Sequence, residues 1–260
     1  MTGTPLAPQR RHTLHFLSEA RAISPVFLDT TVDMTAVNAH RGLGRRYSVV
    51  TYVLKVVAEV LAAHPDANSA LRGRRRPKVA HYSAPVGKLA LDKTIGGQRV
   101  VLSAVFPDLL DGTLDDIQDR VAHYRDGDPE QMPEFAGARA LHKLPWPLGI
   151  AMYRLATRPL AKRERMGTFA VSSLGHRPVE GFHSVGGTTI TVGLGQVADR
   201  PVVRDGQVAV ASTMRLSMSF DHRAIDGAEA ADVLAEIKAA LEAYGVAAPD
   251  TVRSVAGSGR

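Results

Sequence analysis

The hydrophobic and polar positions of this chain switch repeatedly between a two-residue period and a helical period. An alternation typical of strands is found in six stretches and one hairpin. The stretches are residues 25–34, 78–91, 98–106, 167–175, 188–197 and 212–220, and the hairpin is 201–210 with Asp205-Gly206 as its two-residue turn. Strands separated by helical segments predict an α/β fold.

Three helices are marked by capping residues or by an apolar stripe. Ser48 is placed to cap a helix that runs to about Ala63 and carries valines along one face. Thr113 precedes a second helix, whose acidic first turn suits the positive end of the helix dipole. A final amphipathic helix is predicted from Ala228 to Tyr244.

Residues 127–165 have the least regular pattern. A loop is followed by a stretch at about 140–165 that predicts an amphipathic helix after Pro145 and Pro147. Packing in the core or in a trimer is favoured over contact with a membrane or a partner protein. The ends, 1–9 and 246–260, are rich in small residues and proline, which predicts flexible tails.

The composition narrows the class of protein. With 260 residues and 45% hydrophobic content, the chain is long enough for one large domain or two small ones. It contains no cysteine, which excludes disulfides, zinc-thiolate clusters and a cysteine nucleophile. Neither an export signal nor a membrane span is recognisable, and a cytoplasmic location is expected.

The net charge of +6 raises the question of an anionic partner. The densest basic run, residues 72–78, is not interleaved with aromatic residues, and aromatics make up only 5% of the chain. Proteins that bind single strands stack the bases on such aromatics, so no nucleic-acid partner is expected. A solvated loop is the first interpretation of this run, and a site for an anionic small molecule is the second.

Three further candidates carry weak signals. The sequence Gly193–Ala198 has the spacing of a dinucleotide-binding turn, but a hairpin rather than a helix follows it. His12 and His15 have the spacing of metal ligands on one helical face, yet no third ligand is near, so surface histidines and no metal site are expected. A G-x-S-x-G elbow for an esterase-type serine is missing from the sequence.

The stretch SFDHRAIDGAEAADVL, residues 219–234, joins a strand pattern to a helix pattern and concentrates charged groups at the junction. His222 at the end of a buried strand is suited to act as a general base near neutral pH. Asp226, four residues later, is placed to cap the following helix or to accept from an arginine. A polar turn with a capping aspartate is an equally weighted interpretation. Asp221 and Arg223 are assigned to structural ion pairing.

Two motifs in this half of the chain resemble one family. SMSFDHRAIDGAEAADVL contains a DHRxxDG signature, and GTFAVSSLGH, about fifty residues earlier, contains a strand that ends in a serine turn. Both are similar to the acyltransferase catalytic domain of 2-oxoacid dehydrogenase complexes, and looser similarities extend over residues 10–73. The resemblance implies a chloramphenicol acetyltransferase-like fold, which is a two-layer α/β sandwich with a mixed central sheet. It also implies a single catalytic domain over 10–245, with the stretch at about 140–165 as a helical insertion.

The resemblance also implies roles for individual residues. His222 matches the general base, and Ser172 matches the serine that donates to the oxyanion, with its neighbour Ser173 as the alternative. Asp226 matches the group that steadies the loop of the base and pairs with an arginine near the N-terminus. The structural support of the site is assigned to Arg10 or Arg11, Gly227 and Ser173.

The implied reaction is a direct acyl transfer in a homotrimer. Each site of the family lies between two subunits, acyl-CoA is a co-substrate, and no tightly bound cofactor is expected. The printed sequence contains no lipoyl domain, which favours a free-standing enzyme that acylates a hydroxyl of a small molecule, possibly in secondary metabolism. One alternative is the core of a 2-oxoacid dehydrogenase complex served by a lipoyl domain on another chain. Another is a non-catalytic member that binds a ligand or a protein.

Overall fold

A computed structural model describes residues 3–73, 76–157 and 164–245 of the chain. The strands are β1 (Pro25–Asp33), β2 (Ser69–Arg72), β3 (Lys78–His81), β4 (Gly87–Ile95), β5 (Gln98–Phe106), β6 (Phe169–Ser173), β7 (Ile190–Leu194), β8 (Ala198–Arg204) and β9 (Gln207–Asp221). The helices are α1 (Arg11–Ala20), α2 (Thr35–Gly42), α3 (Val49–Ala63), α4 (Leu114–Asp126), α5 (Ala136–Lys143), α6 (Trp146–Thr157) and α8 (Gly227–Glu242), with 3-10 turns at Pro8–Arg10, Pro133–Phe135 and Glu164–Met166. The predicted tail 246–260 lies outside the described residues.

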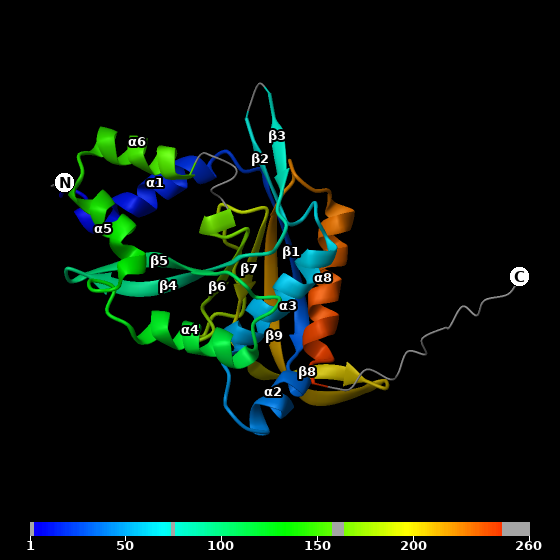
Figure 1. The fold of residues 1–260 in the computed structure, drawn as a ribbon. Coiled ribbons are helices and arrows are strands. Elements are labelled where there is room, and N and C mark those ends of the chain that lie inside the picture. Colours follow the sequence, from blue (N-terminus) through cyan, green and yellow to red (C-terminus); the bar gives the residue numbers. More distant parts are fainter. Residues whose placement is uncertain (1–2, 74–75, 158–163, 246–260) are drawn as a thin grey trace, which may run out of the picture.

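A mixed seven-stranded sheet forms the centre of the molecule (Figure 1). Its strand order is β1-β9-β7-β6-β4-β5, and β8 pairs with the free part of β9. The β4–β6 and β6–β7 pairs are parallel, and the other pairs are antiparallel. The predicted α/β class with a mixed central sheet is confirmed.

The core lies between one face of this sheet and a layer of helices. Strand residues such as Phe169 and Phe220 and helix residues such as Val53 and Val233 belong to one cluster and are at most 1% exposed. Helix α8 packs on α3 and β1, and α4 packs on α3 and β5. We call this face of the sheet the inner face and the opposite one the outer face.

The predicted helix caps are confirmed. The Ser48 side chain accepts a hydrogen bond from the Thr51 backbone at the start of α3. Thr113 and Asp116 form a reciprocal capping box at the start of α4. The side chain of Gln118 accepts from the Ser48 backbone and the Thr51 hydroxyl, both at 2.7 Å, and so joins the two helices at their N-terminal ends.

Two predicted strand boundaries differ from the observed ones. The second strand of the hairpin and the stretch 212–220 form one strand, β9, because no turn residue interrupts the chain between them and its partners change along its length. It pairs first with β8, then with β1 and β7. The stretch 78–91 is instead divided between β3 and β4, which belong to different sheets, and Pro85 lies between them.

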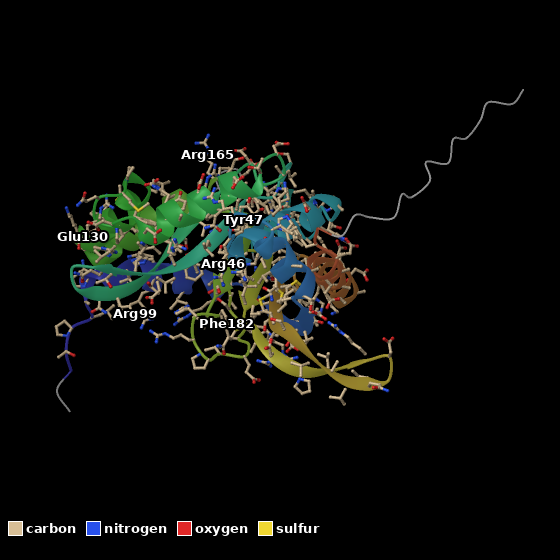
Figure 2. The ribbon with its side chains drawn as sticks, turned by 90° about the horizontal axis from the view of Figure 1, so that it is seen from below. Arg46, Tyr47, Arg99, Glu130, Arg165 and Phe182 are labelled. Carbon is tan, nitrogen blue, oxygen red and sulfur yellow. The ribbon has the colours of Figure 1, made fainter. Side chains whose placement is uncertain are left out.

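A crossing segment, residues 174–189, covers part of the outer face. A Cβ on Gly193 would lie 2.5 Å from the carbonyl oxygen of Phe182, which Figure 2 labels, and a Cβ on Gly195 would overlap the carbonyl of Glu180. Ser219 donates to the carbonyl of Ser184 from the same face. The two glycines of the weak dinucleotide motif therefore permit close backbone packing, and strand β8 follows them instead of a helix.

Helices α5 and α6 lie outside α1 at one end of the molecule (Figure 1). The amphipathic helix predicted after Pro145 and Pro147 is observed as α6, and residues 158–163 of the predicted stretch lie outside the described residues. Helix α5 is separate from it, because Leu144 is extended just before Pro145. Arg11 donates to the carbonyls of His142 and Leu144 at 3.0 and 2.7 Å, which ties the end of α5 to α1. No helix in the described parts of the chain has the length and apolar character needed to cross a bilayer.

The interface of α1 with α5 and α6 contains three histidines. His15 is fully buried against the ring of Trp146, with ring centroids 4.5 Å apart. The Nδ1 atom of His12 lies 2.9 Å from Nε2 of His142. The Nε2 atom of His12 lies 2.8 Å from the Val101 carbonyl oxygen. The expectation of a surface histidine is therefore wrong for His15, because α6 covers that face of α1.

Two of these histidines, His15 and His142, are neutral near pH 7. Burial, and then the neighbouring charges of His12, Arg11 and Arg139, lower the pKa of His142 to about 4. Burial also lowers the pKa of His15. Within the described ranges, no group of three or more candidate metal ligands comes together.

We expect stability to fall on acidification. His142 has a pKa of about 4 in the folded state and about 6.5 in the unfolded state. Between these two pH values only the unfolded state takes up the proton, so the free energy of unfolding decreases as the pH falls from about 6.5 towards about 4. At pH 5 the loss from His142 alone is about 2 kcal/mol. Urea unfolding at pH 7 and pH 5, with Trp146 emission as the local probe, measures it.

The variant His142→Gln should flatten this pH dependence, whereas His176→Gln, at an exposed histidine, should leave it as in the wild type. An unchanged unfolding free energy between pH 7 and pH 5 in the wild type would contradict the prediction.

Candidate active site

The buried carboxylate of Asp221 organises the turn between β9 and α8. Asp221 is 5% exposed and accepts from the backbone N–H groups of Ser24 and Arg223 at 3.3 and 3.2 Å. The Arg223 guanidinium donates to it twice, at 2.8 and 2.5 Å. These bonds raise the pKa of Arg223. The assignment of Asp221 and Arg223 to structural ion pairing is thus confirmed, and the pair anchors both flanks of the turn.

His222 follows this anchor and projects from the turn. Its backbone N–H donates to the carbonyl of Ser24 at 2.9 Å, and its side chain is 47% exposed. The Nδ1 atom lies 3.5 Å from a carboxylate oxygen of Asp226. A carboxylate beside Nδ1 favours the tautomer with the proton on Nδ1, which leaves the lone pair on Nε2. His222 is therefore presented with the atom that a general base uses.

Asp226 is at the N-cap position of α8 but does not cap it with its side chain. Its side chain is 90% exposed. Among the residues that the structure describes, the ion pair of Asp226 is with His222, and neither Arg10 nor Arg11 reaches it within one chain. A Cβ on Gly227 would have no neighbour within 4 Å. Within one chain, no steric constraint therefore requires glycine at this position.

The two serines of β6 lie on opposite faces of the sheet. Phe169 and Val171 belong to the core, so strand alternation places Ser173 on the inner face and Ser172 on the outer face. The Ser173 hydroxyl accepts from the Gly175 backbone at 3.4 Å. In the described part of the chain, no hydrogen bond engages the Ser172 hydroxyl, which favours Ser172 over Ser173 as a donor to substrate.

A cleft of about 710 Å³ opens beside Ser172 and Ser173, where β6 ends while β4 and β5 continue. Basic side chains line part of it. They are Arg10, Lys93, Arg99, Arg125 and His176. The sequence alone predicts no residues for the nucleotide of CoA. The basic residues of this cleft are far apart in the chain and form no motif that could have identified them as a group.

His222 and Ser172 are not close to each other in one chain. Residues Phe169, Ile190 and Phe220 are aligned across β6, β7 and β9. Ser172 lies three residues from this line in one direction, and His222 lies two residues from it in the other. The two residues are therefore about five residues apart along the strands, at about 3.3 Å each, and two strand spacings apart across the sheet, at about 4.8 Å each. The distance between their Cα atoms is then roughly 19 Å.

A second cavity, of about 870 Å³, lies next to the anchored turn. Its walls include Asp221 and Arg223 from the turn, Thr189 at the end of the crossing segment, and Tyr153 and Thr157 from α6. The backbone N–H of Asp221 donates to the Thr189 carbonyl at 2.9 Å. Helix α6 therefore borders the turn through a cavity that Asp221 and Arg223 line, and His222 is not among its lining residues.

The two aspartates of the turn permit a matched test of the anchor. Asp221→Asn should lower the free energy of unfolding by about 2 kcal/mol, because buried hydrogen bonds to a charged group are lost. Asp226→Asn makes the same chemical change at an exposed side chain and should stay within about 0.5 kcal/mol of the wild type. Chemical denaturation of both variants measures this, and equal losses would show that the anchor is not specific to Asp221.

Comparison with known proteins connects this geometry to a family. Residues 156–248 match the family model of the 2-oxoacid dehydrogenases acyltransferase (catalytic domain), a range that contains Ser172, His222 and Asp226. Over 50 residues the chain is 48% identical to the dihydrolipoyllysine-residue acetyltransferase component of the pyruvate dehydrogenase complex of Bacillus subtilis. That alignment covers 19% of this chain and 11% of the relative, so the match spans about a tenth of the relative's length.

The similarity of the fold extends over nearly the whole chain. The dihydrolipoamide acetyltransferase of Azotobacter vinelandii is similar with a TM-score of 0.68 and 19% identity, over 93% of this chain and 91% of that chain. A chloramphenicol acetyltransferase structure is similar with a TM-score of 0.53 and 14% identity, over 89% and 94% of the two chains. Residues 156–248 therefore match the model of the 2-oxoacid dehydrogenase acyltransferase catalytic domains, within a chain that has the chloramphenicol acetyltransferase-like fold.

Proposed function

We propose that this chain is an acyltransferase that moves an acyl group directly between CoA and the thiol of a dihydrolipoyl group. The observation that carries the proposal is the anchored His222, whose Nδ1 faces a carboxylate and whose Nε2 is offered as a base. The family match over residues 156–248 includes this histidine and Ser172.

The proposed step needs no covalent enzyme intermediate. In the direction of CoA acylation, Nε2 of His222 removes the proton from the CoA thiol, and the sulfur attacks the thioester carbonyl of the acyl-lipoyl group. The Ser172 hydroxyl donates to the oxyanion of the tetrahedral intermediate. The intermediate collapses with cleavage of the original C–S bond, and the leaving lipoyl thiolate recovers the proton from His222. Atoms and charge balance without a metal or a redox partner.

Support for these roles comes from the spacing of the residues. The Azotobacter vinelandii structure belongs to an investigation of a serine, a histidine and an asparagine in the catalytic mechanism, with the asparagine four positions after the histidine. Asp226 is four positions after His222. We infer that the Asp226 carboxylate takes the place of that amide and holds the imidazole through Nδ1.

The complete site requires two copies of the chain. A hydroxyl and an imidazole roughly 19 Å apart cannot contact one thioester carbonyl. A contact that brings the outer face of β6 in one copy to the β9–α8 turn of the next would complete each site, and three such contacts close a ring. We therefore propose the homotrimer that the family resemblance implies.

The proposed acceptor is a dihydrolipoyl group, as in the alternative of a 2-oxoacid dehydrogenase core served by a lipoyl domain on another chain. The matched relative is a dihydrolipoyllysine-residue acetyltransferase component, which acts on a lipoyl group, and no observation favours a small hydroxylated molecule. In this proposal a lipoyl domain delivers the acyl group. The basic residues beside Ser172 suit the phosphates of CoA.

The choice of acceptor is tested by incubation with acetyl-CoA and either dihydrolipoamide or a panel of small alcohols. Release of free CoA with formation of S-acetyl-dihydrolipoamide, identified by mass, is expected for the first. Turnover with an alcohol and none with dihydrolipoamide would contradict the proposed thiol acceptor and would support a hydroxyl acceptor instead. No turnover with any acceptor would favour a non-catalytic protein.

The roles of the two residues are tested by substitution. His222→Ala should abolish transfer while the oligomeric mass is retained. Ser172→Ala should lower kcat by about 10² to 10³, because one oxyanion donor is lost. Ser173→Ala is the matched control, since its hydroxyl lies on the inner face, and it should keep most of the activity.

The position of the site between subunits is tested by mixing. When His222→Ala and Ser172→Ala chains are unfolded, mixed equally and refolded together, about a quarter of the sites should receive both intact residues. Activity should therefore recover to about a quarter of the wild-type value. If the mixture stays as inactive as the separate variants, each site lies within one chain and the proposed assembly is wrong.

A further inference from the structure

The outer side of α6 is a continuous apolar stripe that faces solvent. We define it as Leu148, Ala151, Met152, Leu155 and Ala156, which recur at the i, i+3, i+4, i+7, i+8 spacing of one helical face. All five are exposed, and Leu155 is 72% exposed. None of them carries a hydrogen-bonding side chain.

The opposite side of α6 is already occupied by α1. Gly149 packs so closely on His15 that a Cβ would lie 2.9 Å from its Nε2. Arg154 donates to Glu19 at 2.8 Å and so joins the two helices. The stripe is therefore exposed after the helix has made its contacts within the chain. Of the two expected packings, in the core or in a trimer, the stripe does not show the first.

The charge of the protein is concentrated in the same segment. Residues 139–165 contain seven lysines and arginines and one acid, an excess of six, and the whole chain has a net charge of +6. The rest of the chain is therefore electrically balanced. The described members of this basic set are Arg139, Lys143, Arg154 and Arg165, and Figure 2 shows Arg165 at the rim of the molecule.

We propose that the apolar stripe of α6 docks in the plane of a lipid bilayer that contains anionic lipids. A helix of 12 residues is about 18 Å long, too short to span a hydrocarbon core of about 30 Å, so it lies along the surface. Exposed cations on the chain before and after α6, such as Lys143 and Arg165, are attracted to anionic headgroups. Trp146, at the start of α6 and 44% exposed, is of the type that sits at the membrane interface.

Charge and chemistry favour this occupant over a protein. A two-fold contact of this face with the same face of a second copy would bring two basic segments together, which costs electrostatic energy. A protein interface carries about one hydrogen bond per 100–200 Å², whereas the stripe offers none from its side chains and the interior of a bilayer requires none. The hydrophobic pattern of the sequence favours no membrane partner, because it does not reveal which side of the helix is covered.

The test uses the full chain and vesicles of phosphatidylcholine with or without phosphatidylglycerol. The wild type should co-sediment with the anionic vesicles only and should be released by high salt. Trp146 is the single tryptophan, so its emission should shift to shorter wavelength on binding. Met152→Gln with Leu155→Gln should weaken vesicle binding at least about tenfold, because two apolar side chains lose burial.

Two control variants and one further test variant complete the experiment. The first control is Leu43→Gln, at a leucine that is 85% exposed beside α2, and it should bind like the wild type. The test variant Lys143→Gln should weaken binding to anionic vesicles, whereas its control, Arg46→Gln at an exposed arginine before α3, should not. Circular dichroism confirms that each variant is folded.

The proposal is overturned if the wild type stays in solution with anionic vesicles at low salt, or if the double variant binds as well as the wild type. A change in oligomeric mass of the double variant without vesicle binding by the wild type would instead assign the stripe to a contact between copies. Acyl transfer by the wild type in solution does not depend on vesicle binding, so it is measured separately from the docking experiment.

Discussion

The carboxylate of Asp221 is the interaction on which the candidate site depends. Asp221 is the last residue of β9, the longest strand of the sheet. Its carboxylate accepts hydrogen bonds from the backbone N–H groups of Ser24, just before β1, and of Arg223, and the Arg223 guanidinium neutralises its charge. A buried carboxylate is costly unless its oxygens are paired, so these partners hold the turn in one conformation. His222 is the next residue, and its position follows from this network.

The long strand β9 relates that turn to the rest of the molecule. It pairs with β1 and β7 at one end and with β8 at the other. Because β6 runs alongside β7, the same register that positions His222 also determines where Ser172 lies. The two residues emerge at opposite ends of the strands, and a site that uses both must be completed by a second copy.

Helices α5 and α6 shape the surface rather than the core. They cover α1 and bury the imidazoles of His15 and His142, and α6 forms a wall of the cavity beside the anchored turn. The burial keeps these histidines neutral, so this interface is the part of the fold that is sensitive to acid. The outer side of α6 remains apolar in a strongly basic segment, which is the arrangement of a helix that contacts an anionic surface.

Local chemistry was sufficient to predict much of this protein. The caps at Ser48 and Thr113, the Asp205-Gly206 turn and the alternation of the strands are encoded by neighbouring residues, and each was recovered. The motif around His222 identified a candidate base for the same reason. Local patterns did not show that β9 is continuous, because that depends on which strands lie beside it.

Only the tertiary structure decided questions that involve distant residues. It separated Ser172 from Ser173 by the face on which each lies, buried His15 under α6, and placed Arg11 on α5 rather than on Asp226. It also left the stripe of α6 exposed. The sequence by itself determined the elements and the chemistry they carry, since these follow from adjacent residues. Exposure, partners and the distance between the two halves of the site arise only when segments far apart in the chain pack together.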